Sequence, residues 1–331
     1  MNEEWSEFLT TRTNTNQNGI ELSCALNDLS HLGLIRISGE DAETYLQGQL
    51  TNDVRKVTSQ HSNLAGWCNA KGRMLANFRC FRRSDDYFLQ TPLENLPSVM
   101  QRLGMYVLRA KVTLSDISDE LIRIGLTGDC SDALLQPFFD DIPEQPNDVQ
   151  QQGELTLIRL PGSKPRFEII GPVNLVEEIW QTAEGQAQTG NVDFWALQEI
   201  RAGIPTIYQE TKEAFVPQMT NMQLIDGVSF TKGCYTGQEI VARMQYLGKL
   251  KRRMYLAHVD TTTEPQPGDE LFAKQSTSGQ GTGKVVEAQA SGDGYDLLAV
   301  IEIASVEEDQ VLLGEQGPPL EILNLPYPFS E

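Results

Sequence analysis

The chain has 331 residues, enough for two or three domains of ordinary size. Hydrophobic residues make up 40% of it and charged residues 22%, a globular composition that excludes a disordered, collagen-like or coiled-coil protein. Its 26 lysines and arginines against 46 aspartates and glutamates give a net charge of −20, so the surface as a whole repels phosphate backbones. We therefore expect any anionic partner to be bound locally.

The acidic residues are distributed unevenly. Residues 260–331 hold fourteen acidic side chains against two lysines. Residues 54–84 hold seven basic side chains and no acidic one, and residues 231–256 hold six basic against one acidic. These two acid-poor segments are the candidates for a local anion site.

Several classes of protein and site are not expected. There is no run of 18 apolar residues, and the first twenty residues lack the basic start and apolar stretch of a secretion signal, which favours a cytoplasmic protein without a membrane segment. Because the cysteines are odd in number and widely spaced, and no two of the three histidines have metal-ligand spacing, we expect no disulfide framework, no CxxC site and no metal. The cysteines are Cys24, Cys68, Cys80, Cys130 and Cys234.

The N-terminal part mixes strands and helices. Residues 1–20 are polar without an apolar period and predict a flexible tail. Residues 32–38 alternate as a strand does, and a helix follows with Ala42, Tyr45 and Leu46 on its apolar side. The next predicted elements are strands at 63–67, 75–82 and 87–90 and a helix at 96–106.

The rest of the chain continues this mixed order, which favours an α+β protein. Residues 140–153, with two prolines and three consecutive glutamines, predict a surface loop, and residues 261–269 a boundary before short strands typical of a small β-barrel or sandwich. The predicted middle elements are strands at 121–126, 154–160 and 166–170 and helices at 130–138 and 175–182. The predicted C-terminal strands are 270–273, 283–288, 295–303, 310–312 and 320–325.

The segment 229–249 contains the most informative group of residues. Thr236 and Glu239 have the spacing of a capping box, which predicts a helix from about Gly237 to about Gly248. Lys232 and Cys234 precede that helix, where backbone amides, a lysine and the positive end of the helix dipole would stabilise an anion and lower the pKa of the thiol. The alternative is that Cys234 is a small buried packing residue. A nucleophilic Cys-His pair would need a histidine brought in by the fold.

Trp195 is a second candidate. It belongs to a predicted helix that begins after Asp193 and ends at Gly203. At about 100° per residue it points away from the apolar stripe and shares a face with Glu199 and Ala202. A tryptophan on a polar face stacks on a ligand or fills an interdomain contact, and the two alternatives are equally supported.

Residues 232–239 resemble the K-G-C-Y/F-x-G-Q-E signature of the YgfZ folate-binding proteins, which are related to the aminomethyltransferase of glycine cleavage. In this chain the signature comprises Lys232, Gly233, Cys234, Tyr235, Gly237, Gln238 and Glu239. Four further motifs support the resemblance, which runs from about residue 22 to residue 327: they are residues 45–54, 69–73, 202–205 and 217–221.

The resemblance implies a fold. It is a three-domain ring like that of the aminomethyltransferase, with residues 21–114 and 191–247 forming the folate-binding domain. Residues 115–190 would form a ferredoxin-like middle domain, and residues 248–331 a C-terminal β-barrel.

The resemblance also implies a function, namely a folate-binding accessory protein that supports tRNA methylthiolation and iron–sulfur enzymes, such as a tRNA methylthiotransferase, through tetrahydrofolate or another reduced folate. Trp195 matches a tryptophan that contacts folate, whereas Leu32 stands where relatives have a second one, and Arg201 where they often have glutamate. Gln238 and Glu239 would complete the folate site. Cys234 and Lys232 would carry any chemistry.

The competing interpretation is a transferase that moves an aminomethyl or one-carbon group to tetrahydrofolate. The aminomethyltransferase relatives use an Asp-Asp pair where this chain has Ala76 and Asn77. We therefore expect a binding protein rather than a turnover enzyme. Direct tRNA binding ranks below both interpretations.

Overall fold

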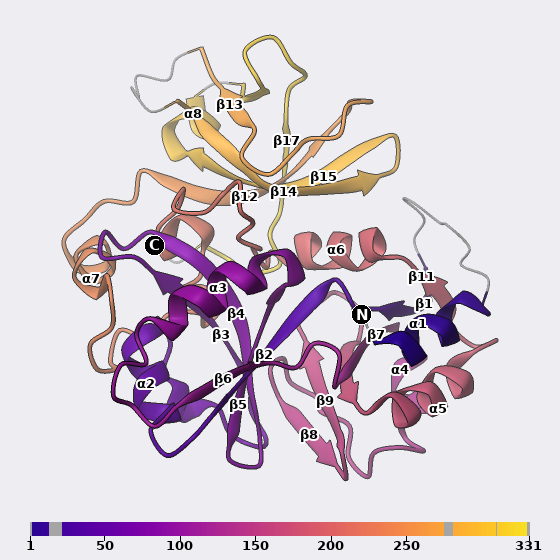
Figure 1. The fold of residues 1–331 in the computed structure, drawn as a ribbon. Coiled ribbons are helices and arrows are strands. Elements are labelled where there is room, and N and C mark those ends of the chain that lie inside the picture. Colours follow the sequence, from indigo (N-terminus) through magenta and orange to yellow (C-terminus); the bar gives the residue numbers. More distant parts are fainter. Residues whose placement is uncertain (1, 13–21, 275–280, 309, 330–331) are drawn as a thin grey trace. The chain divides into compact units, whose positions relative to one another are not determined.

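A computed structural model describes residues 2–12, 22–274, 281–308 and 310–329 (Figure 1). The chain divides into two compact units. Unit 1 holds residues 1–47, 53–63 and 78–195, and unit 2 holds residues 48–52, 64–77 and 196–331. Each unit is thus built from segments far apart in the sequence, and the expected division into three domains stays a prediction.

A six-stranded sheet in unit 1 has the topology of the expected ferredoxin-like domain. With β8 set aside, which lies between α4 and β9 in the chain, the elements β7, α4, β9, β10, α5 and β11 have the order βαββαβ, and the sheet order is β11-β1-β7-β10-β9-β8. Strand β1 is inserted between β7 and β11, and β8 extends the opposite edge. The bounds are β1 (Cys24–Asp28), β7 (Ile122–Gly128), α4 (Ser131–Leu135), β8 (Val149–Gln152), β9 (Leu155–Leu160), β10 (Arg166–Gly171), α5 (Val173–Ala183) and β11 (Gln188–Gly190).

One face of this sheet is covered by α4 and α5 (Figure 1). Because successive side chains of a strand point to opposite faces, Phe167 and Ile169 of β10 enter the same core as Val176 and Trp180 of α5. Burying one such side chain contributes about 1.5–3 kcal/mol. The other face of β10 carries Arg166 and Glu168 and is left for different contacts.

The N-terminus begins with a helix, α1 (Glu3–Thr10), so the prediction of a flexible tail is wrong for residues 2–12. The side chain of Asn2 accepts a hydrogen bond from the backbone N–H of Trp5 and caps the helix. Trp5 is fully buried edge-on against Trp180, and its indole N–H donates to Asp28. Two buried aromatic side chains, Trp5 and Phe8, in an otherwise polar stretch produce no regular apolar period, so this helix was not predicted from the sequence. Residues 1 and 13–20 of the predicted tail lie outside the described residues.

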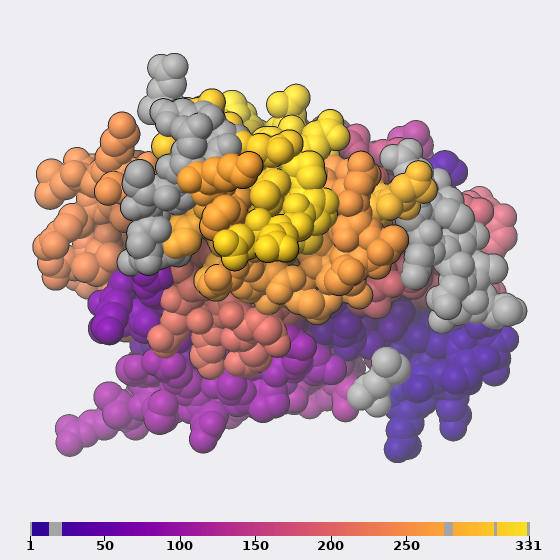
Figure 2. Space-filling view, turned by 90° about the horizontal axis from the view of Figure 1, so that it is seen from above, coloured from indigo at the N-terminus to yellow at the C-terminus, as the bar shows by residue number. Residues whose placement is uncertain are grey.

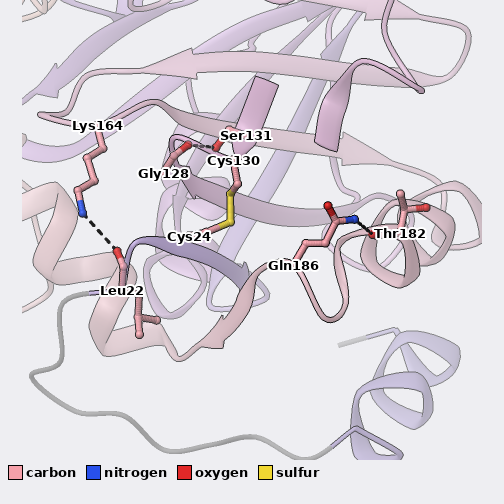
Figure 3. The surroundings of a disulfide bond; sticks show 8 residues. All are labelled: Leu22, Cys24, Gly128, Cys130, Ser131, Lys164, Thr182 and Gln186. Atoms are coloured by element: carbon pink, nitrogen blue, oxygen red, sulfur yellow. Dashed lines mark hydrogen bonds between the residues drawn. A yellow bond between two sulfur atoms is a disulfide. The ribbon is translucent and has the colours of Figure 1, made fainter. Parts of the chain in front are cut away.

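Cys24 of β1 and Cys130, just before α4, form a disulfide across 106 positions of sequence (Figure 3). The sequence predicted no disulfide framework, and this one bridge is a correction to that prediction. Spacing along the chain carries no information about distance here, because β1 pairs with β7 and sets Cys24 opposite Gly128, two residues before Cys130. The other three cysteines are free.

A five-stranded sheet has the order β3-β4-β5-β2-β6, and the division between the units passes through it: β3 beyond Asn63 and residues 74–77 of β4 belong to unit 2. The predicted strand at 32–38 and the burial of Ala42, Tyr45 and Leu46 are confirmed. The bounds are β2 (Leu32–Ser38), α2 (Ala42–Gln49), η1 (Val54–Lys56), β3 (Asn63–Cys68), β4 (Met74–Arg83), β5 (Asp86–Pro92), η2 (Leu93–Asn95), α3 (Leu96–Gly104) and β6 (Thr113–Asp116).

The C-terminal part of unit 2 is a curled six-stranded sheet of order β16-β13-β14-β15-β12-β17. In Figure 2 the yellow residues of the C-terminal segment lie beside orange residues of the same unit. This agrees with the pairing of β17 with β12. The bounds are β12 (Arg252–Val259), β13 (Glu270–Phe272), β14 (Gly283–Ser291), β15 (Gly294–Glu302), α8 (Ile303–Glu308), β16 (Leu312–Leu313) and β17 (Glu321–Leu323).

Both faces of this sheet are buried. Met254 and Leu256 of β12 pack in a core with Ile200 and Val241, whereas Tyr255 and Ala257 pack in a second core on the opposite face. The sequence did not predict β12, because a strand buried on both faces has no polar alternation. It also placed β8 in a surface loop, since a four-residue strand containing three glutamines gives no hydrophobic signal.

Candidate functional site

The signature segment leads into helix α7 (Gln238–Tyr246), close to the predicted start. The prediction of a capping box formed by Thr236 and Glu239 is wrong. The N-cap is Gly237, whose φ of 84° lies in the left-handed region, and it receives no side-chain hydrogen bond. Glu239 is exposed and instead pairs with Arg243 one turn later at 2.8 Å. Such an exposed pair contributes little to stability.

Gly237 joins the signature to a second motif, residues 69–73. A Cβ at Gly237 would collide with the carbonyl oxygen of Asn69, and one at Gly72 would lie 2.9 Å from Cβ of Ile240 in α7. Both glycines have positive φ. The two motifs therefore depend on glycine at each position for close approach of the backbones.

Lys232 is buried rather than presented to solvent. The residue is 6% exposed. Its ammonium group donates a hydrogen bond to the carbonyl oxygen of Leu50 at 2.6 Å, and the same nitrogen lies 5.0 Å from the ring centroid of Tyr235. The expectation that its charge helps to hold a free anion is therefore not met in this structure. A charged donor to a buried carbonyl is a strong hydrogen bond, and Lys232 holds the signature loop in place.

The motif at residues 45–54 supplies the other anchors of this loop. Thr51 donates to the carbonyl oxygen of Gly227 and accepts from the N–H of Gly66, both at 2.7 Å. The amide nitrogen of Asn52 donates to the carbonyl oxygens of Leu64 and Asp226. These bonds fix the segment that precedes the signature.

Cys234 is exposed and has a free thiol. Cys68 and Cys80 are buried and shielded from solvent, and burial raises the pKa of the Cys68 thiol to about 12, so Cys68 is inert at neutral pH. The alternative that Cys234 is a packing residue is therefore wrong. An exposed thiol on a loop held at both ends can attack an electrophile or form a mixed disulfide. No group of metal-ligating side chains occurs in the described parts of the chain.

A thiol titration tests both cysteine assignments. We expect Ellman's reagent to find one reactive thiol in the native protein, three after unfolding without reductant, and five after reduction. Mass spectrometry of the labelled native protein should place the single modification on Cys234. Two reactive thiols at Cys24 and Cys130 in protein purified without reductant would contradict the bridge, and an unreactive Cys234 would contradict its exposure.

Arg201, at the end of helix α6 (Val192–Arg201), forms a salt bridge to Asp296 at 2.9 Å and donates to Ser291 at 3.0 Å. Asp296 also contacts His258 at 2.8 Å, and this hydrogen bond raises the pKa of the histidine. The structure therefore commits Arg201 to a polar network with β14 and β15. Its contact with a pterin stays a prediction.

Asn77, which stands in place of an acidic residue of the transferase relatives, forms two hydrogen bonds with the segment of residues 205–207. Its amide nitrogen donates to the carbonyl oxygen of Pro205 at 2.8 Å, and its oxygen accepts from the N–H of Ile207 at 2.9 Å. Ala76 is fully buried. Asn77 thus holds the segment of residues 205–207, and Ala76 is a core residue.

Glu287 is a buried carboxyl group beside this segment that sequence reasoning missed. It lies at the β-bulge of β14, accepts from the N–H of Thr206 at 3.1 Å and contacts the Tyr208 hydroxyl at 3.4 Å. Burial first, and then the charge of Glu199, raises the pKa of Glu287 to about 8. Its sequence signal is a single acid inside the apolar run of residues 285–288.

Trp195 lies in unit 1 and is 2% exposed, so the prediction that it occupies a polar face is wrong. The guanidinium of Arg166 lies 4.6 Å from its ring centroid, and a Cβ at Gly125 would overlap the indole. The spacing of apolar residues in a short helix identifies only one buried side. Trp195 lies on the other side, which is buried by contacts with Gly125 and Arg166. Leu32, half-buried, packs against the same hydrophobic cluster.

The residues around Trp195 fit a polar heterocycle. Arg166 and Glu168 are buried side chains of β10, and Glu168 accepts from the side-chain amide of Gln90. The buried hydroxyls of Thr127 and Thr156 have no partner among the described residues. A pterin presents N–H donors and ring acceptors, which these groups can satisfy. These groups match the hydrogen-bonding pattern of a pterin, and the indole of Trp195 is buried beneath Arg166.

The sequence-predicted residues fall into two sets. Trp195 and Leu32 belong to one cluster of unit 1. Lys232, Cys234, Gln238 and Glu239 belong to the signature, which is the second set and lies in unit 2. Arg201 belongs to neither set, because it lies in a separate network of unit 2. Sequence reasoning missed Glu287, whose signal is its place in the apolar run 285–288, and the buried polar groups of β10, which have no such signal.

Comparisons with known proteins agree with this arrangement. A family profile described as the GCVT N-terminal domain matches residues 5–154. The chain is 34% identical over 312 residues to the tRNA-modifying protein YgfZ of Klebsiella pneumoniae (strain 342), covering 94% of this chain and 95% of that protein. It is 38% identical over 250 residues to tRNA-modifying protein YgfZ of Colwellia psychrerythraea, covering 76% of each. For the same-named protein of Escherichia coli O7:K1 the identity is 32%, over 94% of this chain and 95% of that one.

A solved structure shows the same fold. The glycine cleavage system aminomethyltransferase T from Bartonella henselae superposes with a TM-score of 0.68, covering 97% of this chain and 88% of that one, at 17% sequence identity. This likeness confirms the aminomethyltransferase-like fold that the sequence implied. In the described parts of the chain, no helix is long and apolar enough to cross a membrane.

Proposed function

The chain belongs to the YgfZ family, and on this premise we propose that it is a folate-binding accessory protein for tRNA modification by methylthiolation. The observation that carries the proposal is the convergence of family motifs on one exposed thiol. Residues 50–52 and residues 69–72 each contact the signature segment 232–239 within unit 2, and that segment leaves the thiol of Cys234 exposed. A loop without chemical function would not need three anchored motifs.

A reduced folate, such as tetrahydrofolate, is the proposed cofactor, and it would supply or accept a one-carbon unit. Its pterin would be bound in unit 1 beside Trp195, by the polar groups of Arg166, Glu168 and Thr127. The carboxylate of Glu168 would accept N–H donors from the pterin ring. These residues bind and orient the ligand and exclude water from it.

Cys234 is the proposed reactive group. As a thiolate it would attack a disulfide sulfur of a partner, forming a mixed disulfide as the partner's S–S bond breaks and its second sulfur leaves as a thiolate. Lys232 would act as a positioning residue through its bond to Leu50. Gln238 and Glu239, at the start of α7, lie within a few residues of the thiol and would contact the same partner or ligand.

The proposed partners are iron–sulfur enzymes, such as a tRNA methylthiotransferase, in the cytoplasm. The net charge of −20 supports an indirect role in tRNA modification, because a strongly acidic protein has no general affinity for RNA. The protein would therefore act on the modifying enzyme.

Complementation of a bacterial strain lacking its own YgfZ protein tests this function. We expect the wild-type chain to restore methylthiolated nucleosides in tRNA, measured by mass spectrometry, and Cys234→Ser to restore less than a tenth of that amount. Cys80→Ser, which removes a thiol that solvent does not reach, should behave as wild type at equal protein level. Full restoration by Cys234→Ser would refute a chemical role for this thiol, and no restoration by the wild type would refute the function.

A further inference from the structure

A cavity of about 770 Å³ lies wholly within unit 2. Its walls are the end of α7, the turn after the short helix η3 (Pro217–Thr220), the start of β12, and the junction of β15 with α8. A volume of this size is typical of sites for small molecules. The residues assigned above to folate and to the reactive thiol do not line it.

One wall of the cavity is cationic. Lys249 and Lys251, in the segment that precedes β12, and Arg253, at the start of β12, line it. None of the three forms an ion pair with a residue that the structure describes. Two carboxylates, Glu302 and Glu307, also line the cavity, so the cations are in excess. In a chain of net charge −20, unpaired cations that share a cavity indicate an anionic ligand.

A second wall presents hydrogen-bond acceptors. The amide nitrogens of Gln218 and Asn221 donate to the backbone carbonyl oxygens of Val241 and Met254, which fixes the orientation of both amides. Their buried oxygens, and that of Gln223, have no partner among the described residues. Gln218 and Asn221 are 2% and 1% exposed. Buried acceptors without a partner are costly, and a ligand with N–H donors would satisfy them.

An aromatic ring completes the lining. Phe329 lies 4.4 Å from the guanidinium carbon of Arg253, so the cation is held against the ring face. The cavity thus combines cations, fixed amide acceptors and an aromatic surface. A phosphate, the N–H donors of a base and its flat ring match these three features in turn.

We propose that this cavity binds a nucleoside phosphate, with the phosphate against Lys249, Lys251 and Arg253 and the N–H groups of the base against the amide oxygens of Gln218, Asn221 and Gln223. The ligand is either a free nucleotide or one nucleotide of an RNA strand, which share this chemistry. The proposal does not depend on folate binding or on Cys234, because it uses none of their residues.

Calorimetric titration of the full chain with AMP, GMP, CMP, UMP and inorganic phosphate tests the proposal. At least one nucleotide should bind with a stoichiometry of one and more tightly than phosphate. The double variant Lys249→Ala/Lys251→Ala should weaken that binding at least tenfold, whereas Lys274→Ala/Lys284→Ala, which removes the same charge outside the cavity, should not. No saturable nucleotide binding, equal affinity for phosphate, or equal loss in both double variants would overturn it.

Two further measurements assign the base wall and the source of the ligand. Gln223→Ala should weaken nucleotide binding several-fold and leave the affinity for phosphate unchanged, and an equal effect on both ligands would overturn the assignment of the amides to the base. A single-stranded hexaribonucleotide that binds at least tenfold more tightly than the best mononucleotide, with the same loss in Lys249→Ala/Lys251→Ala, would identify RNA as the source. Equal or weaker binding of the hexamer would identify a free nucleotide.

Discussion

Replacing Glu287 with glutamine is expected to remove most of the loss of stability that the protein undergoes as the pH rises from 4.5 to 8. Burial raises the pKa of this carboxyl group to about 8 in the folded state, against 4.5 in the unfolded chain. The folded state therefore favours the protonated form. Its contribution is complete below pH 4.5 and is lost as the pH rises through 8, a change of roughly 5 kcal/mol for this shift.

Urea unfolding of the wild type and Glu287→Gln between pH 4.5 and 9 measures this effect. Glutamine keeps the acceptor for Thr206 and carries no charge, so the variant should match the wild type near pH 5 and exceed it in stability above pH 8. Glu270→Gln is the matched control, because the side chain of Glu270 is exposed in the same sheet. Parallel stability curves for wild type and Glu287→Gln would show that Glu287 is ionised in the folded protein.

Replacing Trp195 with alanine is expected to destabilise unit 1 by about 3–5 kcal/mol, the usual cost of truncating a buried aromatic side chain. The indole packs in one cluster with Leu34, Phe81 and Ile170 and carries the guanidinium of Arg166 on its ring. The loss of stability therefore has two causes: the cavity left by the indole, and the loss of the cation–π contact of the buried Arg166 guanidinium. The midpoint of urea unfolding, followed by circular dichroism, gives the value.

The control for this substitution is Leu108→Ala, which truncates a side chain that is exposed in the same unit and should change stability by less than about 0.5 kcal/mol. A similarly small effect for Trp195→Ala would place the indole at the surface, where the helical period of the sequence put it.

The strands that the sequence predicted well are those with a strong local pattern. Residues 32–38 alternate and form β2 within the predicted bounds, and the apolar side of α2 is the one expected. By contrast, α1 is held by Trp5 through contacts with Trp180 and Asp28, which are remote in sequence. The bridge between Cys24 and Cys130 likewise depends on the pairing of β1 with β7. Features that depend on such long-range contacts have no local signal.

The candidate site divides in the same way. The signature residues mark the loop of Cys234 and the start of α7 because their glycines and their order are specific. The burial of each charged side chain and the identity of its partner were not predictable from the sequence. Lys232, Arg201 and Glu287 have ordinary neighbours in the sequence, and only the fold surrounds them with Leu50, Asp296 and Thr206. Electrostatic function depends on burial, and burial of single polar residues is a tertiary property.

The most direct test of the proposed function is the binding of tetrahydrofolate, kept reduced under anaerobic conditions, to the full chain by calorimetry. The wild type should bind one equivalent. Trp195→Phe, which keeps an aromatic packing residue, should bind at least tenfold more weakly, and Trp180→Phe, a buried tryptophan in the other core of unit 1, should bind as the wild type does. Absence of saturable binding by the wild type, or equal binding by the two variants, would contradict a folate site at Trp195.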